Sequence, residues 1–496
     1  MSRAAALTRQ AAWASAGQLV QALLAMAGTV ILARLLGAET YGLFALGLLF
    51  VGFAEIVTGG HVADILVQKE YATPGHRNAA FAALLAIGSG AALVVGALGT
   101  FAAGFFDEPA LRPLLAGVMI LPFLTALTSV PNQILVRQLR FEVLARIGSV
   151  AALASLLCGV GLALAGFGLW SLVAMEIVRR LVTLVLIVPR AGWTPAFVFS
   201  RRELVEVLRF SSRRVENFGL TYFSQNALPR IVIGQWLGTE ALGLFVVSRR
   251  LLDQLNNVLS GPVAAVAFPA ASRLQADRQK LQRLIASSIR LTTWVFWPMV
   301  LGIVAVAPLL VPLAFGEDWL AAVPVVQILA LGTLRVPVSS FNTAVLVAFG
   351  RMGSLSFISI LSILVGIVFL AIGAQFGLVG IAVALASRQW ILWPVGAWQI
   401  YRVCGFHPMT QLRVMIGAAL PSIVMAVCVL IAGEVLSLER SWFSLALLVM
   451  IGLVTYPLAL ALFNRQRARE LLRAFGDLLG GDIGGARRRL AAVVLE

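Results

Sequence analysis

The sequence contains few charged residues and few cysteines. Charged residues make up 12% of the 496 residues, whereas 60% are hydrophobic, and the mean hydropathy is +0.95. So few charges could not cover the surface of a water-soluble chain of this length. The three cysteines, Cys158, Cys404 and Cys428, all lie in apolar stretches, which excludes a disulfide framework and a cysteine-based metal cluster.

The sequence also lacks the motifs of several common catalytic sites. It contains no Gly-x-x-x-x-Gly-Lys-Ser/Thr nucleotide loop, no Gly-x-Ser-x-Gly elbow and no His-Glu-x-x-His zinc motif. We therefore expect no catalytic residue, no metal site, no cofactor and no enzymatic activity.

Long apolar runs, by contrast, recur from one end of the chain to the other. A run of about 20 apolar residues is long enough to cross a bilayer as a helix. The sequence predicts an all-α polytopic membrane protein with about fourteen transmembrane helices. The predicted spans are 12–35, 42–60, 79–104, 114–132, 145–165, 168–189, 215–237, 242–265, 288–312, 322–346, 353–373, 377–400, 412–433 and 441–463.

Part of the chain is repeated. Residues 36–44 read LGAETYGLF and residues 237–245 read LGTEALGLF, so six of nine positions are identical at a separation of 201 residues. Collinear matches follow at a separation of 209 residues: Phe106, Glu108 and Leu111 with Phe315, Glu317 and Leu320; Phe167–Leu169 with Phe376–Leu378; and Arg179 with Arg388. An internal duplication of membrane helices is typical of transporters.

The duplication predicts two pseudo-symmetric six-helix lobes, followed by two further helices. The expected parts are an N-terminal lobe at 1–190, a cytoplasmic amphipathic linker at 191–214, a C-terminal lobe at 215–404, an added helix pair at 405–463 and a basic cytoplasmic tail at 464–496. The span at 215–237 is the most polar, and we expect it to line water rather than lipid.

The distribution of charge orients the predicted spans. With both ends placed in the cytoplasm, the cytoplasmic side holds 28 of the 38 Lys and Arg residues, and the outer loops hold only Arg112 and Arg440. The outer loops carry eight acidic residues. This bias follows the positive-inside rule, so the net charge of +16 requires no nucleic-acid partner.

When residues at the cytoplasmic ends of the predicted spans are left aside, eight arginines fall within the spans, whereas only three acidic residues do. The acids are Glu55, Glu176 and Asp253; Glu176 and Asp253 each lie four residues from an arginine, Arg180 and Arg249, and can share a helix face with it. The two residues of each pair could simply neutralise each other's charge, and this alternative to a functional role remains open. Glu55 is the strongest candidate for ion coupling, with Asp253 and Glu176 as further candidates.

Arg335 and Arg388 lie about 18 Å into their spans at the helical rise, near the bilayer midplane, and have no acidic residue within four positions. Arginine in lipid is costly, so these side chains must face protein or water. We expect a cationic cavity between the lobes that binds an anionic substrate, since arginine matches phosphate oxygens. Partners on other helices, and snorkelling by Arg34 and Arg230, remain alternatives. The candidate substrate-binding residues are Arg335, Arg388, Arg179, Arg249, Arg250, Arg230 and Arg34.

Several segments together resemble one family. Residues 33–45 and 231–245 are similar to paired signatures of the polysaccharide repeat-unit flippases of the MOP superfamily, and further similarities follow in the same order at 268–274, 316–319 and 324–330. Residues 131–141 resemble the colanic-acid-like exopolysaccharide branch. The resemblance covers residues 10–410. Relatives often carry an acid just before the position of Arg230, where this chain has Pro229.

The resemblance implies a flippase that moves undecaprenyl-pyrophosphate-linked oligosaccharide repeat units across the bacterial inner membrane by alternating access, for lipopolysaccharide, capsule or exopolysaccharide synthesis. Expected partners are the lipid-linked oligosaccharide, membrane lipid, a polysaccharide polymerase and a chain-length regulator. A lipid II-type flippase and a MATE-like drug or cation exporter remain alternatives. A membrane glycosyltransferase would require catalytic carboxylates in a substantial loop, and none is evident.

Overall fold

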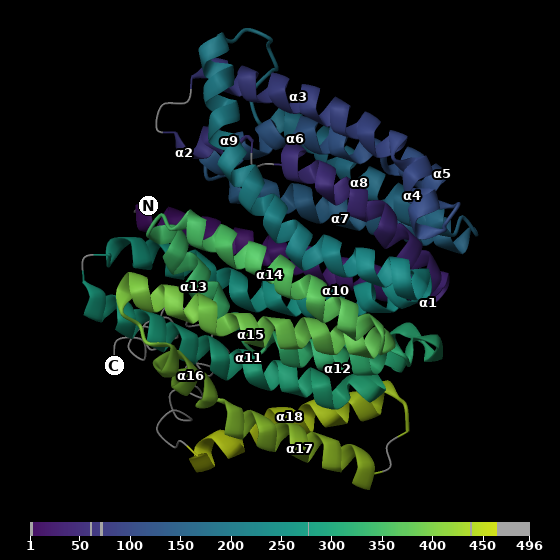
Figure 1. Ribbon diagram of the computed structural model, residues 1–496, viewed down its shortest axis with the longest axis vertical. Coiled ribbons are helices and arrows are strands. Elements are labelled where there is room, and N and C mark those ends of the chain that lie inside the picture. Colours follow the sequence, from purple (N-terminus) through teal and green to yellow (C-terminus); the bar gives the residue numbers. More distant parts are fainter. Residues whose placement is uncertain (1–2, 60–61, 70–72, 276, 437–438, 464–496) are drawn as a thin grey trace. The chain divides into compact units, whose positions relative to one another are not determined.

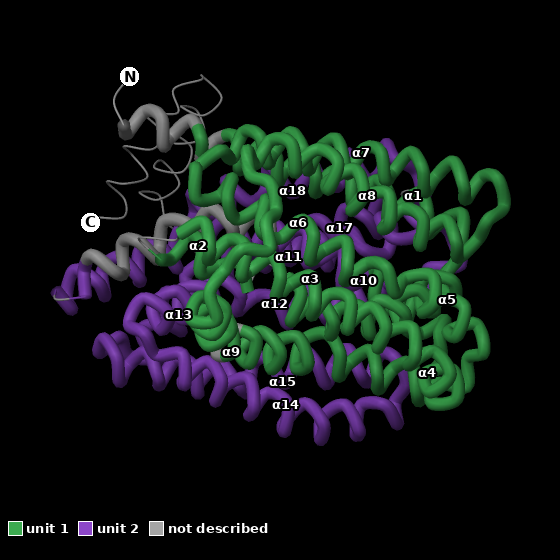
Figure 2. Tube along the Cα trace, turned by 90° about the horizontal axis from the view of Figure 1, so that it is seen from above, with its two compact units in different colours: residues 1–247 green, residues 248–496 purple. Residues whose placement is uncertain are grey.

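The computed structural model describes residues 3–59, 62–69, 73–275, 277–436 and 439–463. Within these ranges every regular element is helical (Figure 1). The predicted basic tail lies outside the described residues. The chain forms two compact units, Met1–Val247 and Ser248–Glu496, which Figure 2 shows in different colours. The all-α polytopic class that the sequence predicts is confirmed.

The first unit contains helices α1 to α9, a short π-helix and the first part of α10. Their bounds are α1 Arg3–Thr58, α2 Ile65–Gln68, α3 Pro74–Ala97, α4 Gly99–Phe106, α5 Leu111–Val118, α6 Ile120–Arg137, α7 Phe141–Leu164, α8 Leu169–Arg190, α9 Arg201–Tyr222, η1 Phe223–Ala227 and α10 Leu228–Arg273.

The second unit contains the rest of α10 and the helices that follow it. Their bounds are α11 Arg278–Phe315, η2 Glu317–Trp319, α12 Ala322–Thr333, α13 Val336–Ala348, α14 Met352–Ala374, α15 Gly377–Cys404, α16 Pro408–Ile416, α17 Ala419–Val435 and α18 Trp442–Phe463.

The helices account for the predicted membrane crossings. Among the described residues, ten helices are long and apolar enough to span a bilayer, or eleven if α12 and α13, which meet at a bend of 46°, form one span. Two of these candidates, 13–58 and 201–256, are 46 and 56 residues long, and each contains a non-helical glycine at which it divides. The polytopic membrane class is thus confirmed, and the predicted number of about fourteen crossings is approximate.

The backbone has matching irregularities at the duplicated positions. Gly37 divides α1 with φ +75°, and Gly238, 201 residues later, divides α10 with φ +83°. Two further pairs, each separated by 209 residues, also have positive φ: Asp107 with Gly316, and Gly168 with Gly377. Because side chains disfavour positive φ, such positions are sparse, and their coincidence supports the duplication.

The two copies of the repeated motif also pack against each other within the first unit. A Cβ added at Gly42 would stand 1.7 Å from the carbonyl oxygen of Thr239, and one at Gly243 would stand 1.8 Å from that of Ala38. The two contacts are equivalent in the duplication, because Gly243 and Thr239 lie 201 residues after Gly42 and Ala38. Backbone therefore touches backbone across a local pseudo-two-fold axis, and only glycine permits the approach.

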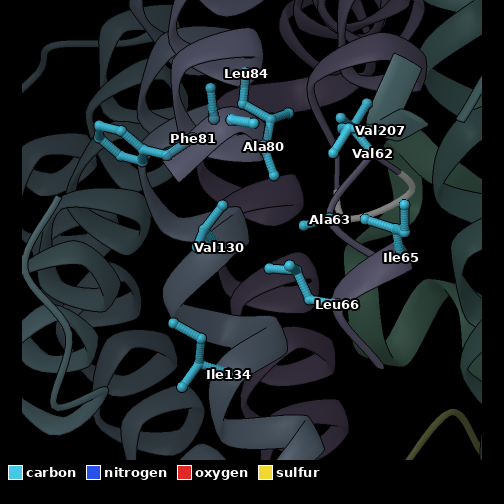
Figure 3. Packing of buried hydrophobic residues seen from close by; sticks show 12 residues of the cluster. Val62, Ala63, Ile65, Leu66, Ala80, Phe81, Leu84, Val130, Ile134 and Val207 are labelled. Carbon is cyan, nitrogen blue, oxygen red and sulfur yellow. The ribbon is translucent and has the colours of Figure 1, made fainter. Parts of the chain in front are cut away.

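The expected linker contributes the start of α9. Ser200 and Glu203 form a capping box, in which the Ser200 hydroxyl accepts from Glu203 N at 3.2 Å and the Glu203 carboxylate accepts from Ser200 N at 2.8 Å. One turn later Val207 is fully buried in an apolar cluster with residues of α2, α3 and α6 (Figure 3). The exposed face carries Arg201 and Arg202. This segment is amphipathic, and its apolar face packs on the first unit.

The last two helices pack on α11 of the second unit. α17 and α18 run side by side (Figure 1), and Val429 and Leu448 form an apolar cluster with Ala305 and Val306 of α11. The Tyr456 hydroxyl donates to a carbonyl of α11 at 2.5 Å. At the start of α11, the backbone N–H of Lys280 and then its ammonium group hold the pKa of the Asp277 carboxyl below its ordinary value.

Candidate functional site: charged side chains within the helices

Three of the predicted arginines gather in the second unit. Arg249 lies on α10, Arg335 lies at the junction of α12 and α13, and Arg388 lies in the middle of α15. Arg388 is 1% exposed, and its guanidinium group lies close enough to those of Arg249 and Arg335 for electrostatic repulsion. The structure therefore brings together side chains that are 53 or more residues apart in sequence.

A break between two helices positions Arg335. α12 ends at Thr333 and α13 begins at Val336, with Pro337 in its first turn. Proline is tolerated there because backbone N–H groups in the first turn have no intrahelical acceptor. The indole of Trp297 donates to the Leu334 carbonyl at 3.0 Å and satisfies a group that the break exposes. Non-helical backbone inside a membrane protein occurs where it is buried in protein or lines a cavity, so the break places Arg335 away from lipid.

Polar partners are identified for two members of the arginine cluster. Arg335 Nε donates to the neutral Gln389 amide oxygen at 3.3 Å, and no described carboxylate lies within ion-pair distance of Arg335. Arg249 Nε lies 3.5 Å from Asp253, whose side chain is 52% exposed. Guanidinium groups donate well to anions with several oxygen acceptors, such as a phosphate or pyrophosphate.

The first unit holds a charged network of the opposite balance. Arg180 donates to Glu176 at 2.6 Å and makes a short contact with Glu55, and its Nε donates to the Thr125 hydroxyl at 3.1 Å. Thr125 in turn donates to Glu55 at 3.1 Å. The predicted pairing of Glu176 with Arg180 is confirmed, and so is that of Arg249 with Asp253.

Two carboxylates surround one guanidinium group in this network. The side chains of Glu55, Glu176 and Arg180 are 31%, 14% and 18% exposed, so they are largely removed from solvent. With both acids ionised the group carries one net negative charge, and protonation of one carboxylate neutralises it.

An aromatic and polar contact lies close to this network in the first unit. Tyr222 donates to the Leu49 carbonyl at 3.0 Å, and its ring meets that of Phe53 edge-on at 5.2 Å between centroids. Gly52 makes room for it, since a Cβ there would lie 2.0 Å from the Tyr222 hydroxyl oxygen. The π-helix Phe223–Ala227 follows at once; such single π-turns are frequent at functional sites.

The remaining predicted arginines have varied environments. Arg34 and Arg179 are exposed, whereas Arg230 and Arg250 are partly buried. Arg179 and Arg388 occupy matching positions in the duplication but differ in burial. Arg230 interacts electrostatically with Tyr222. Thr125 and Gln389 could not be predicted from the sequence, because a neutral polar residue in an apolar helix gives no signal of its partner.

The sequence matches one family over more than half of its length. Residues 31–324 match the family described as polysaccharide biosynthesis protein. The succinoglycan biosynthesis transport protein ExoT of Rhizobium meliloti (strain 1021) is 30% identical over 316 residues, which are 63% of this chain and 63% of that protein. The teichuronic acid biosynthesis protein TuaB of Bacillus subtilis (strain 168) is 27% identical over 310 residues, which are 60% of this chain and 62% of that protein.

Two solved structures share the fold. The lipid II flippase MurJ in an inward closed conformation superposes with a TM-score of 0.74 at 13% identity, over 91% of this chain and 99% of that one. An inward-facing multidrug resistance MATE family transporter of the MOP superfamily superposes with a TM-score of 0.58 at 16% identity. The superposition covers 78% of this chain and 95% of that one. Sequence and fold agree, and the chain belongs to the polysaccharide biosynthesis protein family.

Proposed function

We propose that this protein is a flippase that moves undecaprenyl-pyrophosphate-linked oligosaccharide repeat units from the cytoplasmic to the periplasmic face of the bacterial inner membrane. It works by alternating access and catalyses no chemical reaction. The relatives ExoT and TuaB are named for succinoglycan biosynthesis transport and teichuronic acid biosynthesis, and the fold resembles that of a MOP superfamily transporter. Together they support a role in the synthesis of lipopolysaccharide, capsule or exopolysaccharide.

The observation that carries the proposal is the cluster of Arg249, Arg335 and Arg388. A pyrophosphate group presents several oxygen acceptors, and each guanidinium can donate two parallel hydrogen bonds to such oxygens. Arginine also keeps its charge when it is removed from water. The cluster would hold the pyrophosphate while the glycan follows it across the membrane. Arg250, Arg230, Arg179 and Arg34 would contribute further positive charge along the path.

The network around Arg180 suits a coupling role. Glu55 and Glu176 compete for one guanidinium group, so one carboxylate can take up a proton or cation while the other keeps the ion pair. Asp253 offers a third carboxylate, next to Arg249. We propose that a change of protonation or ion occupancy at these acids accompanies the change of conformation.

Two other functions would use the same fold. A lipid II-type flippase binds a substrate of the same pyrophosphate chemistry, so the arginine cluster fits it equally, and the identity of the glycan separates the two. A MATE-like exporter of cationic drugs would require acidic residues where the second unit presents arginine. The gathering of arginines around Arg388 therefore favours an anionic substrate.

The proposed orientation follows from the charge bias of the loops. Both termini lie in the cytoplasm, residues 1–190 and 215–404 act as the two lobes, and residues 405–463 are an added pair. A cysteine at Asp107 or Glu317 should react with an impermeant reagent in intact cells, whereas one at Lys280 should not. The reverse pattern would show an inverted topology. A polymerase and a chain-length regulator are the protein partners that such a pathway requires.

The test is a gene deletion with complementation. Cells without the protein should accumulate a lipid-linked oligosaccharide on the cytoplasmic side, and its chemical analysis identifies the substrate. In the deletion strain, Arg335→Glu and Arg388→Glu should fail to restore polymer export although each variant reaches normal membrane abundance. The exposed Arg351→Glu, with the same change of charge, should restore polymer export. Full export by both cluster variants would refute the proposed site, and accumulation of no lipid-linked intermediate would refute the function.

A further inference from the structure

An apolar groove lies between α14 and α15 in the second unit. Figure 1 shows these two helices side by side, and the groove has a volume of about 430 Å³. Its lining is almost entirely hydrocarbon. The side chains that form its walls are Phe369, Ile372, Phe376, Val379, Val383 and Ala384.

Two glycines form the floor of the groove. A Cβ added at Gly380 would stand 2.3 Å from the carbonyl oxygen of Gly373, and one at Gly373 would stand 2.7 Å from that of Gly380. The two backbones therefore touch, and the larger side chains on either side stand above the contact. Phe376 is 72% exposed and Ile372 is 54% exposed, so the groove is open along one side.

The groove continues toward the arginine cluster along one helix. Gly380, Ala384 and Arg388 follow one another at intervals of four residues and share a face of α15. Ser387 is the polar residue of the lining and precedes Arg388 directly. From Phe376 to Arg388 the helix rises about 18 Å, more than half of a hydrocarbon core of about 30 Å. An apolar channel that is open along its side thus ends beside buried positive charge.

We propose that this groove binds the polyprenyl chain of the lipid-linked substrate while the arginine cluster holds the pyrophosphate. The inference rests on the function proposed above and assigns the lipid part of the same ligand. A polyprenyl pyrophosphate has an anionic head joined to a long hydrocarbon chain, and the groove and cluster are arranged in that order. In the proposed orientation the turn between α14 and α15 faces the periplasm, so the groove lies in the periplasmic half of the bilayer, beside the arginine cluster.

The test is photo-crosslinking of the full-length protein in nanodiscs of phosphatidylethanolamine and phosphatidylglycerol. The probe is undecaprenyl pyrophosphate with a diazirine in its isoprenoid chain, and labelled peptides are located by mass spectrometry. We expect labels within residues 369–387. We also expect an excess of unlabelled undecaprenyl pyrophosphate to compete at least tenfold better than an excess of phosphatidylglycerol.

Two matched variants accompany the labelling. Val383→Trp should fill the groove and lower both labelling and affinity for the probe about tenfold, while binding of inorganic pyrophosphate stays unchanged. Val368→Trp places the same side chain on the exposed face of α14 outside the groove and should change neither. The first result distinguishes a tail site from a general defect in folding, since a misfolded protein would lose pyrophosphate binding as well.

Three outcomes would overturn the proposal. Equal competition by phosphatidylglycerol would show that ordinary bilayer lipid fills the groove, and labels elsewhere on a protein that binds and transports the probe would place the chain at another site. In both cases the proposed function would stand. Failure to bind the probe at all, with an intact protein by thermal unfolding, would refute the groove site and the proposed function together.

Discussion

The glycine contact between the repeated motifs offers a sharp test of the packing. Replacing Gly42 by Ala puts a methyl group 1.7 Å from the carbonyl oxygen of Thr239, whereas real Cβ atoms almost never come within 3.0 Å of another heavy atom. The obstacle is backbone and cannot rotate away, so the two helices must separate by more than about 1 Å. Overpacking of this kind costs about 1–3 kcal/mol, and we expect the upper end of that range. Alanine's greater helix propensity offsets at most about 1 kcal/mol.

The assay is thermal unfolding of the purified protein in one detergent. Gly42→Ala and Gly243→Ala should each lower the midpoint, and the double variant should lower it by less than the sum, because the first methyl group already separates the backbones. Gly90→Ala is the matched control, since nothing lies within 4 Å of its added Cβ, and it should be neutral or stabilising. A midpoint for Gly42→Ala equal to that of Gly90→Ala would refute the contact.

Three further predictions concern the first unit. Arg180→Gln leaves its two carboxylate partners uncompensated and should destabilise the protein by about 3–5 kcal/mol, and adding Glu55→Gln should recover part of the loss in a double-mutant cycle; a purely additive cycle would argue against the pair. Ser200→Ala removes the N-cap side chain of α9 and should cost about 0.5–2 kcal/mol, seen as faster proteolysis at the start of that helix, and unchanged cleavage would contradict it. Tyr222→Phe loses the hydrogen bond to Leu49 and should lower the unfolding free energy by about 0.5–1.5 kcal/mol, whereas an unchanged value would show that the bond contributes nothing.

Local patterns in the sequence predicted much of the fold. Apolar run length predicted the all-α polytopic class, and the repeated motif located Gly37 and Gly238, where the structure divides α1 and α10. Helical spacing also predicted the ion pair between Glu176 and Arg180, because residues four apart share a face whatever the rest of the chain does.

Contacts between helices that are distant in sequence could not be predicted, for a physical reason. The pairing of Glu55 with Arg180 joins residues 125 positions apart, and periodicity does not specify which helix faces which. Arg179 and Arg388 match in the duplication, yet one is exposed and the other buried, because neighbouring helices rather than the repeat determine burial. The groove at Gly373 and Gly380 likewise depends on how closely two helices approach, which composition alone does not reveal.

The central claim is that the arginine cluster of the second unit binds the pyrophosphate of a lipid-linked substrate. Its most direct test is equilibrium binding of undecaprenyl pyrophosphate to the purified protein in nanodiscs. Arg335→Gln and Arg388→Gln should each weaken binding at least about tenfold, since a hydrogen bond to a charged group contributes about 1.5–3 kcal/mol. Lysine at either position should recover part of the affinity, because it keeps the positive charge but cannot donate the two parallel hydrogen bonds of a guanidinium group. Arg351→Gln should bind like the unaltered protein, and unchanged affinity in both cluster variants would contradict the account.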